Sequence, residues 1–328
     1  MKGIRRLNPL WLLAVVAVGV LPFAGVGTYP LQILTLAGIN AVVAMGLNLV
    51  LGTAGQISLG QAAFVGIGAY TTARLVTALG VSFWIAMPAG GLLAGIMGAG
   101  LGYLALRFQG HYLAMVTLCF GLIMHIFFME FPFLTGGAAG ITNIPNAGFL
   151  GYMIDNGTDA VIKTFHVAWF LVLLVTWLLN NLTTLGSGRA LAALRDDPIA
   201  AESAGIPTAV YKVQAFTASA VVAGLAGGVY AVHTHYVGPE IFGVGASLEF
   251  LVMVVIGGLG SPMGAILGAL LMAILPETMR SYEEYRLLFF GMILMLIVVA
   301  VPGGMWGVLY SCATRMRTAV IGKPASGG

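Results

Sequence analysis

Charged residues are scarce in this chain of 328 residues. Asp, Glu, Lys and Arg together make up 8% of it, whereas apolar residues make up 59%. A soluble globular domain carries about 25% charged residues, which it needs to cover a surface that faces water. The composition therefore excludes an ordinary soluble protein and predicts a protein that is surrounded by lipid.

Motifs for enzyme chemistry are also missing. The two cysteines, Cys119 and Cys312, lie among apolar residues and predict neither a metal cluster nor a disulfide framework. No phosphate-binding loop of the form G-x-x-x-x-G-K-[ST] is present, because Gly322-Lys323 is followed by Pro324. An intramembrane hydrolase would need a serine with a base in reach, and no motif places one. We expect a chain that is not an enzyme and holds no metal and no cofactor.

Long apolar runs are abundant instead. A membrane-spanning helix needs about 20 mostly apolar residues. Runs of roughly this length occupy 9–27, 30–51, 57–79, 84–106, 111–131, 165–183, 214–236, 248–275 and 287–310. The first run follows basic residues, but it is long enough to span, and we interpret it as a retained helix and not as a cleaved signal peptide. The pattern predicts an all-α polytopic bundle, with residues 1–328 forming a single transmembrane domain.

Basic residues predict the orientation of this bundle, since they favour the cytoplasmic side. The N-terminal cluster Lys2, Arg5 and Arg6 places the start of the chain inside. The polar stretch 184–212 then falls inside, and the polar stretch 132–164, with only Lys163, falls outside. The tail 312–328, which is basic and expected to be flexible, should also be cytoplasmic. Nine full spans would place that tail outside, so one run must not cross.

The run 248–275 resolves this conflict, because it is interrupted in its middle. A straight helix through that interruption would be costly, whereas broken helices are tolerated where they are buried in protein or line a cavity. We therefore predict about eight full spans and one re-entrant broken helix, or eight to ten helices in all, with both termini cytoplasmic. The residues that form the predicted break are Gly257, Gly258, Gly260 and Pro262.

The stretch 184–212 holds most of the charge in the centre of the chain. Its pattern predicts two short helices, Arg189–Arg195 and Ile199–Ala204. Asp196 or Asp197 is suited to cap the second helix, with Pro198 in its first position and Gly205 after its end. A short helix rich in small residues between two spans suits insertion into a groove on another protein. The alternative is a solvated cytoplasmic loop without a partner.

The sequence from Arg189 to Ile206, Arg-Ala-Leu-x-Ala-Leu-Arg-Asp-Asp-x-Ile-Ala-Ala-Glu-x-x-Gly-Ile, resembles the coupling loop of ABC importer permeases, in the version of branched-chain amino acid permeases of the LivM type. Blocks at 46–70, 110–121, 134–141, 223–228 and 255–261 resemble the same family in the same order. Pro198 departs from the pattern, which more often has a polar residue there. The resemblance implies that this loop docks into a cleft of an ATPase subunit through Arg189, Arg195, Asp196, Asp197, Ala200, Ala201, Glu202 and Gly205.

The resemblance also implies the function and the partners. The chain would be a permease subunit in the bacterial inner membrane that forms half of a path for branched-chain amino acids. Its partners would be a second homologous permease, two ATP-binding subunits and a periplasmic or lipid-anchored substrate-binding protein, with lipid around it and no nucleic acid. Permeases for urea and short-chain amides are very similar, which leaves the substrate open. An ion-coupled secondary transporter is a further alternative, which Glu249 beside a broken helix would suit.

Polar side chains inside the apolar runs are candidates for the path, because such residues tend to face the interior of a bundle. Ser58 and Gln61, three positions apart, would share one face of a helix. Hydrogen bonds between helices, worth about 0.6 kcal/mol each, are the alternative role. The candidate path residues are Asn40, Asn48, Gln56, Ser58, Gln61, Tyr70, Thr71, Ser247 and Glu249.

Two other groups of residues carry expectations. Thr135, Gly136 and Gly137 should lie at the outer mouth, where backbone N–H groups would contact a substrate or a docked binding protein; a plain flexible loop is the alternative. Small-residue pairs four positions apart predict close helix crossings. These pairs are Gly91 with Gly95, Gly98 with Gly102, Gly224 with Gly228, and Gly260 with Gly264 and Gly268.

Overall fold

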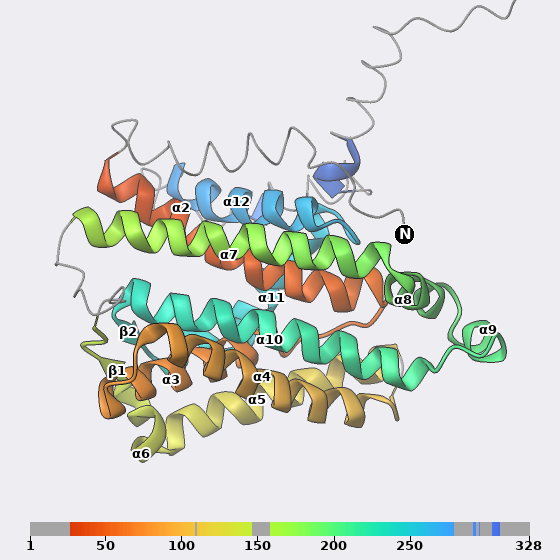
Figure 1. Ribbon diagram of the computed structural model, residues 1–328, viewed down its shortest axis with the longest axis horizontal. Helices are drawn as coiled ribbons and strands as arrows, with labels where there is room; N and C mark the ends of the chain where they lie inside the picture. The colour runs from red at the N-terminus through yellow and green to blue at the C-terminus, as the bar shows by residue number, and fades with distance from the viewer. Residues whose placement is uncertain are drawn as a thin grey trace, which may run out of the picture.

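The computed structural model describes residues 27–108, 110–145, 158–278, 291–292, 295 and 304–308. Over these residues the chain is a bundle of long helices that run side by side (Figure 1). The α-helices are α2 (Thr28–Asn48), α3 (Gln61–Leu79), α4 (Phe83–Ala105), α5 (His111–Glu130), α6 (Pro132–Thr135), α7 (Thr158–Thr184), α8 (Gly186–Asp196), α9 (Pro198–Ser203), α10 (Thr208–Thr234), α11 (Val244–Gly257) and α12 (Pro262–Thr278). The remaining elements are the π-helix η2 (Leu49–Thr53), the 3-10 helices η3 (Gly137–Ala139) and η4 (Pro239–Phe242), and the strands β1 (Ile141–Thr142) and β2 (Tyr236–Val237).

Six helices in the described part of the chain are long and apolar enough to cross a membrane. The pair α11 and α12 makes a seventh span if it is counted as one. The prediction of an all-α polytopic bundle is confirmed. Residues 9–26 of the first run, most of 287–310 and the tail 312–328 lie outside the described residues. The total of about eight spans and the location of the termini therefore stay predictions.

The two polar stretches lie at opposite ends of the bundle (Figure 1). At one end α8 and α9 project from the helices, and Arg195 contacts Gly52 beyond the end of α2. At the other end β1 pairs antiparallel with β2, with Ile141 opposite Val237. We call these the loop end and the sheet end. The predicted 132–164 stretch is shorter than expected, because α7 already begins at Thr158.

Glycines let α3, α4 and α10 approach closely, as the small-residue pairs on α4 and α10 predicted. The predicted pairing of Gly260 with Gly264 on one helix is wrong, because Gly260 lies in the turn between α11 and α12. A Cβ on Gly98 of α4 would lie only 2.3 Å from the Cβ of Ala220 on α10. A Cβ on Gly68 of α3 would lie 2.0 Å from the carbonyl oxygen of Gly224 on α10. No larger residue fits at such crossings without moving a helix. These three helices therefore form the tightly packed centre of one side of the bundle.

The predicted break in the run 248–275 is confirmed. Helix α11 ends at Gly257, α12 begins at Pro262, and the two are bent by 120°. The turn between them needs glycine, since Gly258 and Gly260 have φ values of 121° and 80°. The turn lies at the loop end, where Asn48 of α2 contacts it. At the sheet end, α11 follows η4 and Tyr29 donates a hydrogen bond to Glu277 near the end of α12.

The expectation for the run 57–79 is wrong at its start. Helix α3 begins only at Gln61, after the π-helix η2 and a non-helical segment that contains Gly55 with a φ of 69°. In this segment the Leu59 N–H donates to Thr117 of α5, at 2.9 Å, and does not continue a helix. Ser58 therefore lies before the helix, and the predicted shared helix face with Gln61 does not exist.

Candidate functional site

Helices α8 and α9 form the part of the loop end that stands furthest from the bundle (Figure 1). The predicted cap of the second helix is Asp197, whose Oδ1 accepts the N–H groups of Ile199 at 2.8 Å and Ala200 at 3.1 Å. Pro198 is the first residue of α9. Gly205 follows the helix with a φ of 81°, a value that suits glycine. The local sequence thus fixes a short, well-defined helix, and the two predicted helices are confirmed with small shifts in their bounds.

The exposed side of α9 carries an apolar side chain. Ile199 is 78% exposed, and Ala200 and Glu202 beside it are also exposed. Ala201 is only 4% exposed, so it belongs to the inner side of the segment and not to its outer surface. The sequence interpretation missed Ile199. The signal that would have found it is a large apolar residue in the middle of a charged segment between two spans.

The two basic residues of α8, Arg189 and Arg195, have different surroundings. Arg189 is exposed. Arg195 turns toward the bundle, where its Nη1 donates a hydrogen bond of 2.8 Å to the carbonyl oxygen of Gly52 in η2. Its aliphatic part covers Gly55, on which a Cβ would lie 2.9 Å from the Arg195 Cγ. Asp196 is exposed at the end of α8. Arg195 is itself exposed, so its guanidinium reaches η2 along the surface of the bundle, and Ala201 is the one predicted coupling residue that is buried.

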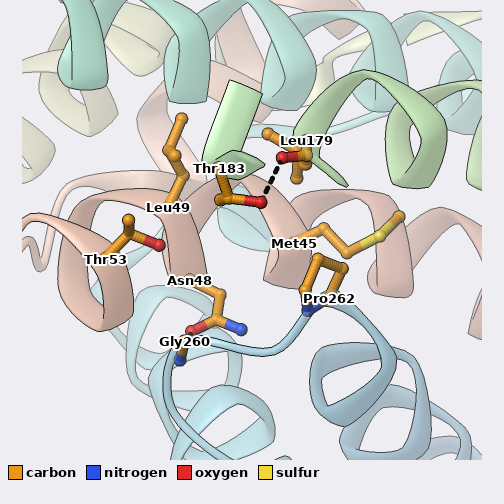
Figure 2. Close-up of a pocket in the computed structure, with 8 residues that line it drawn as sticks. All are labelled: Met45, Asn48, Leu49, Thr53, Leu179, Thr183, Gly260 and Pro262. Carbon is orange, nitrogen blue, oxygen red and sulfur yellow. Dashed lines mark hydrogen bonds between the residues drawn. The ribbon is translucent and has the colours of Figure 1, made fainter. Parts of the chain in front are cut away.

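Asn48, a predicted path residue, holds the turn between α11 and α12 instead (Figure 2). Its Oδ1 accepts the N–H of Gly260 at 2.8 Å, and its Nδ2 donates to the Ser261 carbonyl oxygen at 2.8 Å. The side chain is 3% exposed. A small cavity beside it is bordered by Leu179 and Thr183 from the last turns of α7. Both polar groups of Asn48 are thus used inside the chain.

Three further predicted path residues also make hydrogen bonds within the chain. Gln61 donates to Ser219 of α10 at 3.2 Å. Ser247 of α11 accepts the N–H of Ala62 in the first turn of α3, at 3.1 Å. Thr71 donates to the carbonyl oxygen of Ile67 in its own helix, at 2.6 Å. The contacts of Gln61 and Ser247 favour the alternative role of polar residues that hold the helices together, whereas the Thr71 hydroxyl bonds only within its own helix.

The remaining path residues do not gather at one place. Gln56 and Ser58 lie in the segment after η2, at the loop end. Their Oε1 and Oγ atoms are buried without a hydrogen-bond partner among the described residues. The buried Tyr70 hydroxyl also has no such partner, but Tyr70 packs against Phe128 and Phe242 toward the sheet end, with ring centroids 4.8 and 6.0 Å away. Two residues lie nearer the surface of the bundle: Asn40 is half-buried on α2 and Glu249 is exposed on α11.

The N–H groups of Gly136 and Gly137, which were predicted to contact a substrate or a docked binding protein, already make hydrogen bonds within the chain. The Gly136 N–H donates to the Pro132 carbonyl oxygen at 2.9 Å, and the Gly137 N–H donates to Thr135 Oγ1 at 3.2 Å. Thr135 in turn is buried and donates to the last turn of α5. The segment is a closed turn, and its polar groups stabilise the connection from α5 to η3.

Exposed aromatic residues surround this turn at the sheet end. Phe133 is 84% exposed and Phe131 is 50% exposed. Arg74 of α3 donates a hydrogen bond to the Phe133 carbonyl oxygen and lies 5.9 Å from the centre of its ring. Aromatic and basic side chains of this kind are enriched where a membrane meets water. The sequence interpretation missed Arg74 because it lies inside an apolar run.

Comparisons with known proteins agree with this architecture. Residues 29–298 match the family described as "Branched-chain amino acid transport system / permease component". The high-affinity branched-chain amino acid transport system permease protein LivM of Escherichia coli K12 is 38% identical over 262 residues, which cover 74% of this chain and 61% of that protein. LivM of Salmonella typhimurium is 37% identical over 261 residues, with the same two shares, so this chain spans 61% of the length of both.

A more distant relative carries a name that assigns it to the same kind of transport system. The permease protein LivH of Salmonella typhimurium is 25% identical over 256 residues, which cover 74% of this chain and 82% of LivH. No solved structure matches the chain. The family match extends over most of the described helices, from α2 through α12. The chain therefore belongs to the family of permease components of branched-chain amino acid transport systems.

Proposed function

We propose that this chain is the permease subunit of a bacterial ABC importer and forms half of a path for branched-chain amino acids across the inner membrane. The observation that carries the proposal is the exposed, capped helix α9 at the loop end of a bundle of spanning helices. The names of the relatives, which are permease proteins of high-affinity branched-chain amino acid transport systems, support the substrate class.

Helix α9 is proposed to dock into a cleft of an ATP-binding subunit. An isoleucine that is 78% exposed in a water-facing segment gains free energy when a partner covers it. The cap at Asp197 holds the helix in shape before docking, which lowers the entropic cost of binding. Two ATP-binding subunits, one for this chain and one for a second homologous permease, supply the hydrolysis.

The loop end is proposed to face the cytoplasm. Arg107, Arg189 and Lys212 lie at this end, and basic residues favour the cytoplasmic side. The sheet end then faces the periplasm, where a substrate-binding protein delivers the amino acid. In this orientation α11 and α12 enter and leave on the periplasmic side as a re-entrant pair, and about eight full spans leave both termini in the cytoplasm.

The path is proposed to run along the face of α11 that carries Glu249, and a second permease completes it. Glu249 lies roughly 8 Å along α11 from Val244 at 1.5 Å per residue, and its side chain is exposed. A carboxylate at that depth is costly against lipid, so this face meets water or protein. The Glu249 carboxylate on this face offers a charged group to the ammonium group of an amino acid zwitterion.

Transport then follows alternating access. When the ATP-binding subunits close, they move α8 and α9, and the helices change their packing at the loop end so that the path opens to one side at a time. The permease binds no nucleotide itself; its contribution is to turn a movement at α9 into a change in the path.

The experiment that tests the proposal is uptake of labelled leucine into proteoliposomes. The chain is co-expressed with the second permease, the ATP-binding subunits and the binding protein, and unlabelled urea is the competitor. Uptake that needs ATP and is unaffected by urea supports a branched-chain amino acid importer. In a parallel assay with labelled urea, ATP-dependent uptake of urea without leucine uptake would contradict the substrate. Leucine uptake without ATP would contradict an ABC importer.

A further inference from the structure

Three separate segments meet at the loop end of the bundle. They are the end of α8, the π-helix η2 that continues α2, and the turn between α11 and α12. Two side chains join them: Arg195 donates to the Gly52 carbonyl oxygen at 2.8 Å, and Asn48 both accepts from Gly260 and donates to Ser261 at 2.8 Å. All of these bonds end on backbone groups, so a movement of one segment acts directly on the backbone of the next.

The contact between η2 and the turn is too close for any side chain. A Cβ on Gly52 would lie 2.3 Å from the backbone nitrogen of Gly260 and 2.1 Å from Asn48 Oδ1. The two backbones therefore touch without an intervening layer that would absorb a displacement. The Arg195 Nη1 also lies 3.8 Å from the Cβ position of Gly260, so the guanidinium reaches both segments.

The geometry of η2 suits a segment that changes shape. Its Ala54 N–H donates to the Leu49 carbonyl oxygen at 3.1 Å, five residues back, in place of the usual four. Single π-turns inside α-helices often occur at functional sites. The last turns of α7, which lead into α8 through Leu185 alone, border the same place through Leu179 and Thr183 (Figure 2).

We propose that Arg195 is a transmission residue, which passes a movement of α8 and α9 to η2 and, through Asn48, to the turn between α11 and α12. This inference rests on the proposed function, in which an ATP-binding subunit moves α9. It changes the role of Arg195 from a contact with that subunit to a contact inside the permease. Ile199 and Glu202 receive the movement, and Arg195 carries it into the membrane-spanning helices.

The first test uses the purified full chain alone in nanodiscs and does not depend on any partner. Amide hydrogen exchange is measured by mass spectrometry for the peptide that contains residues 256–263. Arg195→Ala should raise exchange in this peptide, because the turn loses its link to α8. Arg107→Ala, which removes an exposed arginine at the same end of the bundle, is the matched control and should leave the peptide unchanged. Unchanged exchange in Arg195→Ala would overturn the proposed link, whatever the transport activity.

The second test uses the complex with its ATP-binding subunits in proteoliposomes. Ser261→Cys, in a background with Cys119→Ala and Cys312→Ala, is labelled by a membrane-impermeant maleimide with and without ATP and vanadate. The parent complex should show a labelling rate that depends on trapping. Arg195→Ala should lose this dependence, consume more ATP per leucine imported and keep its ATP-binding subunits. Arg195→Lys, which retains one N–H donor to Gly52, should restore part of the dependence.

The outcomes separate the two proposals. Loss of the ATP-binding subunits from the Arg195→Ala complex would make Arg195 a docking contact and would overturn its role as a transmission residue. The role as a transmission residue is also overturned if trapping with ATP and vanadate still changes the labelling rate of Ser261→Cys in the Arg195→Ala complex. If the parent complex shows no ATP-dependent uptake, the proposed importer function fails, while the exchange measurement on the isolated chain still decides whether Arg195 is linked to the turn.

Discussion

Gln61 of α3 and Ser219 of α10 hold each other through a reciprocal pair of hydrogen bonds. The Gln61 Nε2 donates to the Ser219 Oγ at 3.2 Å, and that hydroxyl donates back to the Gln61 Oε1 at 3.3 Å. Both side chains are 1% exposed. The pair therefore ties two central helices together in a place that water does not reach.

This arrangement predicts a stability effect and no effect on substrate affinity. Gln61→Met, Ser219→Ala and the double variant form a double-mutant cycle, which should give a coupling energy of about 0.6 kcal/mol, the usual value for such bonds in membranes. The measurement is thermal or denaturant unfolding in detergent, and leucine uptake provides the KM. A KM that rises in Gln61→Met without a loss of stability would instead assign Gln61 to the path.

The close crossing of α4 and α10 predicts a strong difference between two glycines of the same helix. In Gly98→Ala the new Cβ would meet the Cβ of Ala220 at 2.3 Å, and overpacking of this kind costs about 1–3 kcal/mol. In Gly100→Ala the new Cβ meets nothing within 4 Å, so the variant should be as stable as the parent or slightly more stable. Fluorescence-detected size-exclusion chromatography after heating compares the two. Equal melting temperatures would contradict the crossing.

The exposed side of α9 predicts that Ile199 contributes to docking. Ile199→Asp should weaken binding of the ATP-binding subunit by about tenfold or more, or about 1.4 kcal/mol, because a charge replaces a covered apolar side chain. Ile199→Met keeps the apolar volume and should bind nearly as the parent does. Binding is measured by pull-down of the ATP-binding subunit with the permease in nanodiscs. If Ile199→Asp binds the ATP-binding subunit as strongly as Ile199→Met and the parent do, α9 is not the docking element.

Ala201 is unsuited to the same test. The resemblance groups it with the docking residues, but it is 4% exposed, so a large residue there disturbs α9 itself. Ala201→Arg should raise amide exchange throughout 198–206 in the isolated chain, whereas Ile199→Asp should not. If Ala201→Arg leaves this exchange unchanged, its side chain points outward and Ala201 belongs to the docking surface after all.

Much of the fold can be predicted from sequence, because it depends on local chemistry. Three features can be predicted from a few neighbouring residues each. They are the spanning helices, from the length of the apolar runs; the start of α9, from the capping pattern at Asp197; and the broken helix, from its glycines and proline. The failures concern contacts between distant segments. That Asn48 bonds to Gly260, and that Ser58 lies before α3 and not on it, depends on which helices meet. A polar residue in an apolar run has the same sequence signal whether it lines a path or ties two helices together.

The proposed orientation predicts the side from which cysteines are labelled. In the background that lacks Cys119 and Cys312, Ser203→Cys on α9 and Thr318→Cys in the C-terminal tail should react with an impermeant maleimide only from the cytoplasmic side. Gly245→Cys, at the start of α11, should react only from the periplasmic side. Labelling is compared in intact spheroplasts and inverted vesicles. Reaction of Thr318→Cys from outside would remove the re-entrant assignment of α11 and α12.

A variant of Glu249 tests whether the path follows the exposed face of α11. Glu249→Gln keeps the shape of the side chain and removes its charge, so the variant should fold and assemble but bind the ammonium group of the amino acid less well. We expect a rise of about tenfold in the KM for leucine, with a smaller change in the maximal rate. Glu130→Gln, at the exposed sheet end of α5, is the matched control and should transport as the parent does. If Glu249→Gln keeps the KM of the parent but retains less of the second permease and transports more slowly in proportion, the exposed carboxylate contacts that partner and the path lies elsewhere, because a residue that only joins the subunits does not select the zwitterion.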